Sequence, residues 1–584
     1  AAAAGQTVAL PQTVQAVIEE RLSRLTPQTH QLAQLAATIG RGFTVEELAV
    51  ASGFGEDMLV MGLDELWRHR IVREQGERYD FSHDKIREVA YRQASVPRRR
   101  SLHQHVGSAL ALIYAGREDE VAGELAVHAE QVGHIGHAIE YLERAARVEQ
   151  SVGAYADAVV RLRRALHLIP SLPLPAEDVL QRELALLTLL GTCLLALRGY
   201  GDSEVEAVYQ RAHAVCAQLA DDPQLMPILV GLASFYLVRG ELRQALAIAE
   251  QALQLAERVG DDGLLVEAHG ITGIVLQYLG EFQASIAHLE QALSRYDTRL
   301  HSVHAIAYGQ EPGVTCLVLL SISLWQAGYA DRSLEKMREA QALARAVAHP
   351  YTLTFAQTYV AHLYHLRQEP AAAEMAASVS LDSAHRYGLQ YWLAIGAIYL
   401  HWAKTHLAGA CTQTVVDAGS SAADHVAQLQ AAINGFKGTG AGLVESYYLG
   451  IMADAEAAMH RPLAALATLE KARRRAEQNE DFFWLAELQR LRGEFLLALL
   501  DVKQREPEFE AAAEVAFLQA LQTARTQQAH MLELRATTSL ARLWLRQGRR
   551  ENAYESLKSI CNWFTEGWNT PDLQAATTLL AELA

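Results

Sequence analysis

Histidine is the residue type whose spacing in this sequence first suggests chemistry. The chain has 23 histidines in 584 residues, and two pairs, His301 with His304 and His362 with His365, would each place two imidazoles on one face of a helix. Neither pair has the glutamate of an HExxH zinc motif, and no third ligand is evident. We therefore expect no metal site. We expect these histidines to lie on helix surfaces or in a groove.

Other reactive side chains lack the neighbours that catalysis requires. The five cysteines are far apart and form no CxxC pair, which predicts buried free thiols in a reducing compartment, the cytoplasm. No GxSxG nucleophile motif occurs. None of the seven lysines stands in a GxxxxGK[ST] loop, and Lys437, which comes closest, is read as part of a flexible loop. The sequence therefore predicts no catalytic residue, no enzymatic activity and no cofactor in this chain.

Aromatic and histidine residues gather between positions 351 and 402, which is the strongest candidate for a binding surface. They are Tyr351, Tyr359, His362, Tyr364, His365, Tyr391, Trp392, Tyr399, His401 and Trp402. Aromatic side chains supply large contact area at low entropic cost, so Tyr359, His362, Tyr391 and Trp392 are predicted to line a ligand groove. The alternative is that most of the set packs in the core.

The elements that must position these residues form a repeating pattern. From about residue 101 onward, a helix, a glycine-containing turn and a second helix rich in Ala and Leu recur, with turn glycines at positions 153, 199, 240, 280, 328 and 548. The unit resembles the tetratricopeptide repeat, although its spacing is longer than the usual unit of about 34 residues. The resemblance implies about ten helix pairs between 120 and 565, stacked into a right-handed superhelix.

The repeat pattern weakens over residues 350–435. There Pro370 replaces the turn glycine, and the small polar stretch Ala408 to Ala423 is predicted to be a long loop.

The first hundred residues have a different plan. Apolar spacing and capping signals predict helices over about 13–25, 26–39, 44 onward, 57–69 and 84–94, with a hairpin of 71–74 and 78–81 between the last two. Helices followed by a two-stranded wing are the plan of a winged helix. The would-be recognition helix carries Asp57, Asp64 and Glu65 with no basic residue before Arg68, which disfavours DNA binding.

Charge and hydropathy limit the partners. The formal charge is −17, and residues 1–100 contribute 13 basic and 13 acidic side chains, so the later residues carry the whole excess. This argues against a nucleic-acid partner. The longest nearly uncharged apolar run, 313–328, is shorter than the roughly 20 residues of a membrane span, so we expect no membrane partner. The chain does not begin with Met, and we expect it to be a piece of a larger protein.

Residues 79–91, which read YDFSHDKIREVAY, carry a second resemblance. The segment resembles the one that follows the wing in STAND-class signalling ATPases, with Ser82 where Met is more usual. The resemblance implies that His83 contacts the β-phosphate of ADP bound in a neighbouring nucleotide-binding domain, which helps to hold a closed state. An imidazole can donate such a hydrogen bond. The alternative is that His83 and Asp84 only cap the following helix.

The C-terminal region carries a third resemblance. The stretches SYYLG (446–450), WLAELQRLRGE (484–494), LRATTSLARL (534–543) and WFTEG (563–567) are similar to the repeat regions of bacterial predicted ATPases, in which an ATPase domain precedes the repeats. The similarity indicates the family, and it does not identify the signal that the protein senses.

These observations predict an all-α chain: a small winged-helix domain (1–100), a helical linker with first repeats (101–170), and a right-handed tetratricopeptide-repeat-like α-superhelix with a capping helix (171–584). We expect the sensor portion of a STAND ATPase, which binds an inducer protein or small molecule. Its winged helix would control an intramolecular nucleotide-binding domain, with ADP or ATP in the full-length protein. Two alternatives stay open, a stand-alone repeat scaffold and a DNA-binding regulator.

Overall fold

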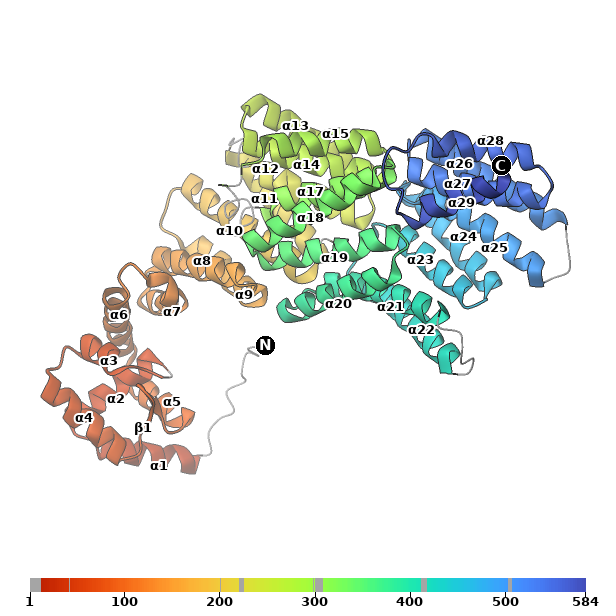
Figure 1. Ribbon diagram of the computed structural model, residues 1–584. Coiled ribbons are helices and arrows are strands. Elements are labelled where there is room, and N and C mark those ends of the chain that lie inside the picture. Colours follow the sequence, from red (N-terminus) through yellow and green to blue (C-terminus); the bar gives the residue numbers. More distant parts are fainter. Residues whose placement is uncertain are drawn as a thin grey trace. The chain divides into compact units, whose positions relative to one another are not determined.

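A computed structural model describes residues 12–40, 42–199, 201–219, 225–297, 299, 308–410, 417–502 and 507–584. The chain divides into two compact units. Unit 1 contains residues 1–148 and 160–179, and unit 2 contains residues 149–159 and 180–584. The chain is essentially all-α, and its helices are drawn in sequence colours in Figure 1.

Unit 1 consists of short helices and one hairpin. The elements are α1 (Gln12–Ser23), α2 (Pro27–Ile39), α3 (Val45–Ser52), α4 (Glu56–Arg68), β1 (Val72–Gln75), β2 (Arg78–Phe81), α5 (Asp84–Gln93), α6 (Val96–Ile113) and α7 (Ala122–Val132), followed by α8 (Ile135–Ser151) and α9 (Tyr155–Leu168), which both reach into unit 2. Strands β1 and β2 pair antiparallel, with Val72 opposite Phe81, so the predicted hairpin is confirmed. A single bridge from Phe43 to Tyr79 adds a third short strand contact beside it.

The capping signals read from the sequence form in unit 1. The Thr44 hydroxyl accepts a hydrogen bond from the Glu47 amide, and the Glu47 carboxylate accepts one from the Thr44 amide, which completes the predicted capping box. The core of the unit runs from Ile18 on α1 to Leu125 on α7. Residue 100, where a domain boundary is predicted, lies inside α6, so this helix continues across it. The three predicted domain ranges remain a prediction.

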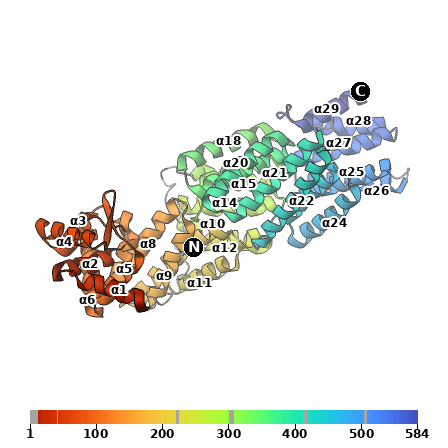
Figure 2. The same cartoon turned by 90° about the horizontal axis from the view of Figure 1, so that it is seen from below.

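Unit 2 is a row of antiparallel helices that pack in sequence order (Figures 1 and 2). The helices are α10 (Ala176–Arg198), α11 (Ser203–Leu219), α12 (Leu225–Arg239), α13 (Leu242–Val259), α14 (Asp262–Tyr278), α15 (Phe282–Arg295), α17 (Pro312–Gln326), α18 (Ala330–Val347), α19 (Pro350–Leu366), α20 (Pro370–Tyr387), α21 (Gln390–Ala410), α22 (Asp417–Gly438), α23 (Glu445–Ala458), α24 (Pro462–Asn479), α25 (Leu485–Val502), α26 (Pro507–Thr526), α27 (His530–Arg546), α28 (Arg550–Cys561) and α29 (Pro571–Leu583). The row forms a tetratricopeptide-like superhelix, as predicted, in which each helix buries its apolar face mainly against its neighbours in sequence.

Six of the described turns within pairs share one backbone feature: those of α12–α13, α14–α15, α17–α18, α19–α20, α23–α24 and α27–α28. In each, the residue two positions before the second helix has a left-handed φ, for example 81° at both Gly240 and Gly280. In the α19–α20 pair this position is Gln368, with a φ of 56°, and Pro370 is the first residue of α20. The prediction that Pro370 replaces the turn glycine is therefore wrong. Proline takes the first helical position because it needs no backbone N–H there.

The predicted loop from Ala408 to Ala423 is also largely helical. Helix α21 continues to Ala410, and α22 begins at Asp417. Alanine is the strongest helix former, and it outweighs the Gly, Ser and Thr residues of this stretch. Residues 411–416 lie outside the described part of the chain.

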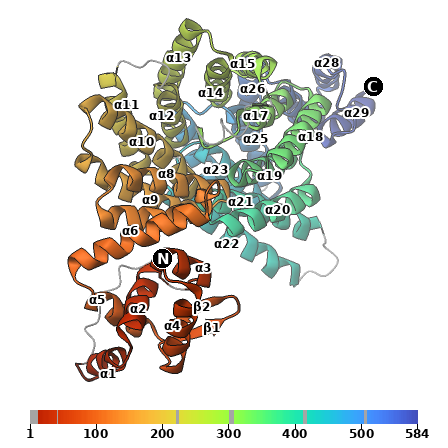
Figure 3. The same cartoon turned by 90° about the vertical axis from the view of Figure 1, so that its left-hand side faces the viewer.

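Segments that are far apart in the sequence meet inside unit 2. The carbonyl of Val238 accepts hydrogen bonds from the amides of Gly442 and Leu443, both at 2.8 Å, and the carbonyl of Tyr278 accepts one from Phe482 at 3.0 Å. Figure 3 shows the later, blue helices beyond the green ones. The superhelix therefore winds back on itself, which leaves less open concave surface than the repeat pattern suggests.

One helix among the described residues, α10, is long and apolar enough to cross a membrane by length and composition. Most of its apolar stretch is buried within the structure, as in the core helix of a folded domain.

Candidate functional site

The four residues predicted to line a ligand groove meet in unit 2. Tyr359 and His362 on α19 face Tyr391 and Trp392 on α21, with Tyr278 on α14 beside them. The ring centroids of Tyr359 and His362 are 5.5 Å apart, and those of Tyr359 and Trp392 are 6.4 Å apart. Trp392 is 4% exposed and His362 is 5% exposed. The sequence thus identified residues that come together, and most of their surface is covered by the protein.

The space that these residues enclose is small. The cavity measures about 20 Å³, enough for one ordered water and far below the several hundred Å³ of an ordinary ligand pocket. The Nε2 atom of His362 and the Nε1 atom of Trp392 are buried without a hydrogen-bond partner among the described residues. Burial lowers the pKa of His362 to about 3, so this imidazole is neutral at physiological pH.

The surrounding aromatic set behaves as core. The Tyr278 and Tyr359 hydroxyls lie 2.9 Å apart, and the Tyr447 hydroxyl lies 2.6 Å from Nδ1 of His365. Burial also lowers the pKa of His365 well below its usual value. The described residues contain no group of three or more metal-ligating side chains, and His301 and His304 lie outside them. The core alternative thus describes this arrangement better than an open groove.

His83 lies at the start of α5, directly after the hairpin of unit 1. Its Nδ1 atom accepts a hydrogen bond from the Lys85 amide at 3.2 Å, which is the helix cap considered in the sequence analysis. The side chain is exposed. Because Nδ1 accepts, the neutral imidazole carries its proton on Nε2, which faces solvent with no partner among the described residues. The cap leaves Nε2 available as a donor.

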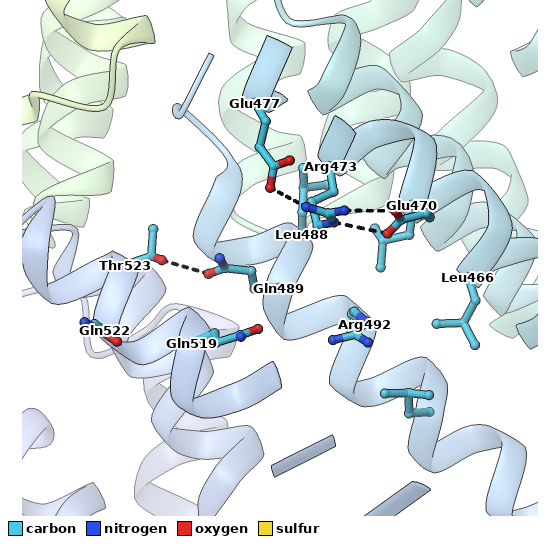
Figure 4. A pocket seen from close by; sticks show the side chains of 12 residues that line it. Leu466, Glu470, Arg473, Glu477, Leu488, Gln489, Arg492, Gln519, Gln522 and Thr523 are labelled. Atoms are coloured by element: carbon cyan, nitrogen blue, oxygen red, sulfur yellow. Dashed lines mark hydrogen bonds and ion pairs between the residues drawn. The ribbon is translucent and has the colours of Figure 1, made fainter. Parts of the chain in front are cut away.

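A cleft of about 670 Å³ lies between α24, α25 and α26 (Figure 4). Helices α24 and α26 both pack against α25, which forms the floor of this cleft. The lining combines four leucines, three glutamines, four charged residues and one threonine: Leu466, Leu469, Leu488, Leu496, Gln489, Gln519, Gln522, Glu470, Arg473, Glu477, Arg492 and Thr523. No sequence signal marks these residues, since a mixed charged and leucine face is normal for a helix.

Some of the charged side chains in the cleft form ion pairs with one another, and one arginine does not. On α24, Arg473 donates to Glu470 at 2.9 and 3.1 Å and to Glu477, and these bonds lower the pKa of Glu470 to about 2. On α25, Arg492 is exposed and makes no hydrogen bond or ion pair to any described residue. The Thr523 hydroxyl donates to Oε1 of Gln489 at 2.8 Å, which leaves the Gln489 NH₂ group free to donate.

A buried ionic cluster joins the last pairs to the middle of the superhelix. The Arg535 guanidinium on α27 donates to Asp572 at 2.8 and 2.9 Å and to the carbonyl of Leu366 at 2.5 Å. It lies 4.9 Å from the centroid of the Trp325 ring and 3.7 Å from Glu487. Only 5% of the Arg535 side chain is exposed. This cluster connects α17, α19, α25, α27 and α29, so its part in unit 2 is structural.

Comparisons with known proteins agree with the repeat architecture. A family profile for the tetratricopeptide repeat matches residues 224–298, which cover α12 to α15. An uncharacterised protein of Rhizobium meliloti (strain 1021) is 23% identical over 544 residues, which are 92% of this chain and 50% of that protein. The chain therefore spans about half the length of this curated relative.

Two solved structures are similar at low sequence identity. A STAND protein with a tetratricopeptide repeat sensor from Pyrococcus horikoshii is 13% identical, with a TM-score of 0.47 over 83% of this chain and 68% of that chain. The APC/C hetero-tetramer Cut9–Hcn1 is also 13% identical, with a TM-score of 0.44 over 98% of this chain and 97% of that chain.

Proposed function

We propose that this chain is the regulatory, ligand-sensing portion of a STAND-type signalling ATPase that works in the cytoplasm. The observation that carries the proposal is His83, which is exposed directly after the β1–β2 hairpin with a free Nε2 donor. The order of helices, hairpin and α5 in unit 1 supports the interpretation of this region as a winged helix. In this proposal Nε2 of His83 donates to the β-phosphate of ADP in a nucleotide-binding domain, and the closed state retains ADP.

The position of His83 is suited to an anion. It caps α5, and the dipole of a helix N-terminus favours negative charge, an effect that the Asp84 carboxylate in the same turn partly offsets. A phosphate at this end would meet the Nε2 donor together with that field. The cap bond orients the imidazole, so the two roles considered for His83 are compatible.

The repeat array is the sensing part of the proposal. Tetratricopeptide repeats bind protein partners on their surfaces, and here an inducer, protein or small molecule, would bind the superhelix better in its open state than in its closed state. This differential binding would shift the equilibrium and release ADP. Helix α4 displays Met58, Met61 and Trp67 on its exposed face with acidic neighbours, which argues further against DNA.

The coding sequence upstream of this chain supplies the first test. The proposal requires a P-loop nucleotide-binding domain there, and its absence would leave the stand-alone scaffold as the better interpretation.

A pair of substitutions in that longer protein then separates the two roles of His83. His83→Ser keeps a preferred N-cap residue but removes the Nε2 donor, whereas His83→Ala removes both. Both variants are expected to release bound ADP faster than the parent, and only His83→Ala should lower the melting temperature. Unchanged ADP release in both variants would refute the phosphate contact.

A further inference from the structure

We propose that the cleft between α24, α25 and α26 binds an extended peptide segment that presents an acidic side chain to Arg492. This site is distinct from the aromatic set predicted from the sequence. The inference deepens the proposed function by naming a site and a class of ligand. Peptide binding at this cleft does not depend on the proposed function, and only the regulatory role of that binding rests on it.

The size of the cleft fits such an occupant. Its volume of about 670 Å³ lies within the range of several hundred to a thousand Å³ that holds drug-sized ligands, and it is far larger than the 20 Å³ cavity among the aromatic residues. Each helix contributes one face at helical spacing, such as Gln519, Gln522 and Thr523 on α26. The lining therefore belongs to three regular elements and not to a loop.

The expected charge of the ligand depends on which charged side chains of the cleft already have an ion-pair partner. The two carboxylates on the α24 wall, Glu470 and Glu477, are held by Arg473, and Glu470 also accepts from Arg474. A cationic ligand would have to compete with these bonds. Arg492 has five N–H donors and no partner among the described residues, and a carboxylate can accept two of them side by side.

The remaining polar groups suit a peptide backbone. Gln519 and Gln522 are exposed, with side-chain amides that make no hydrogen bond to the described residues, and Gln489 keeps its NH₂ group free. A carboxamide offers one acceptor and two donors, which match the C=O and N–H groups of an extended chain.

The leucines that line the cleft on α24 and α25 specify a second ligand feature. Leu469, Leu488 and Leu496 are 3%, 2% and 9% exposed, and the half-buried Leu466 stands at their edge. An aliphatic ligand side chain placed on Leu466 would bury apolar surface on both partners, because Leu466 keeps more of its side chain exposed than the other three leucines. The fitting ligand is therefore a peptide with an aliphatic residue near its acidic residue, and not a free anion.

Peptide pools test the proposal on the whole chain, without an ATPase domain. Three fluorescein-labelled octapeptide pools, each acetylated and C-terminally amidated, carry Leu at position 3 and Glu, Gln or Lys at position 5, with the other positions random. Fluorescence anisotropy should show the Glu pool binding at least tenfold more tightly than the Gln and Lys pools. Arg492→Glu should reverse the order, so that the Lys pool binds best.

Arg542→Glu is the matched control, because Arg542 is an exposed arginine on α27 outside the cleft and the charge change is identical. Circular dichroism should show the same helix content in both variants. Equal affinity for the three pools, or an equal effect of the two substitutions, would overturn the proposal. A fourth pool carries Gln at position 5 and a free C-terminal carboxylate. If this pool alone bound, the claim that Arg492 recognises an acidic side chain would be overturned. None of these outcomes depends on ADP retention at His83, so each proposal can fail separately.

Discussion

Removing the Arg535 side chain should strongly destabilise unit 2. In Arg535→Met, the carboxylate of Asp572 and the carbonyl of Leu366 lose their donor, and Trp325 loses its cation. Asp572 has 12% of its side chain exposed, so water can only partly replace the guanidinium. Breaking a buried ion pair by removing one partner costs about 3–5 kcal/mol, and we expect a loss of this size in the free energy of unfolding.

Urea unfolding measured by circular dichroism and tryptophan fluorescence gives this free energy. Arg542→Met on the same helix is the control, and an exposed substitution of this kind should change the stability by no more than about 0.5 kcal/mol. Asp572→Asn combined with Arg535→Met should cost less than the sum of the single changes, with a coupling of about 1–3 kcal/mol. Repeat arrays can unfold in parts, so the two probes are analysed separately. An effect of Arg535→Met equal to that of Arg542→Met would refute the structural role of the cluster.

Three further perturbations test the packing, the charges and the turns of unit 2. Burial raises the pKa of Asp481 to about 6 even though the Ser446 hydroxyl donates to it, so the folded state favours the protonated acid and loses stability as the pH rises from about 4 to 6. Asp481→Asn should therefore stabilise the protein by about 1–3 kcal/mol at pH 7.5 and not at pH 4, as measured by urea unfolding across pH; an equal effect at both pH values would contradict this cause. Gly493→Ala would place a Cβ atom 2.4 Å from the Phe517 ring, and overpacking of this kind should lower the stability by about 1–3 kcal/mol; an unchanged urea midpoint would show that the ring moves without cost. His460→Gly should raise the stability by roughly 1 kcal/mol, because this exposed residue has a φ of 55° that only glycine adopts without strain; a lower midpoint would argue against strain at the turn.

The sequence was sufficient for the local structure because the signals for it are local. The hairpin after α4, the Thr44 capping box and the turn glycines depend on neighbouring residues, and all of them form. The turn at Gln368 was misassigned, since a non-glycine residue in a left-handed conformation leaves no mark in the sequence. The stretch after Ala408 was misassigned because its many alanines favour helix over loop.

The site could be predicted only in part, because burial depends on how the superhelix winds. The aromatic residues near Tyr359 and His362 meet in the structure, and their role in a ligand groove stays a prediction. The hydrogen bonds that join Val238 to Gly442 and bring distant pairs together have no sequence signature. The cleft at Arg492 was missed for a related reason. A free arginine and a paired arginine such as Arg473 look the same in a sequence, and only the arrangement of three helices separates them.

The most direct test of the central claim is the rate of ADP release from the longer protein that contains this chain. The account predicts that His83→Ala and His83→Ser both release ADP faster than the parent protein, by a similar factor, although only the first loses the helix cap. If both variants retained ADP as the parent does, or if only His83→Ala released it faster, His83 would be a helix cap alone and the proposed control of the nucleotide would be contradicted.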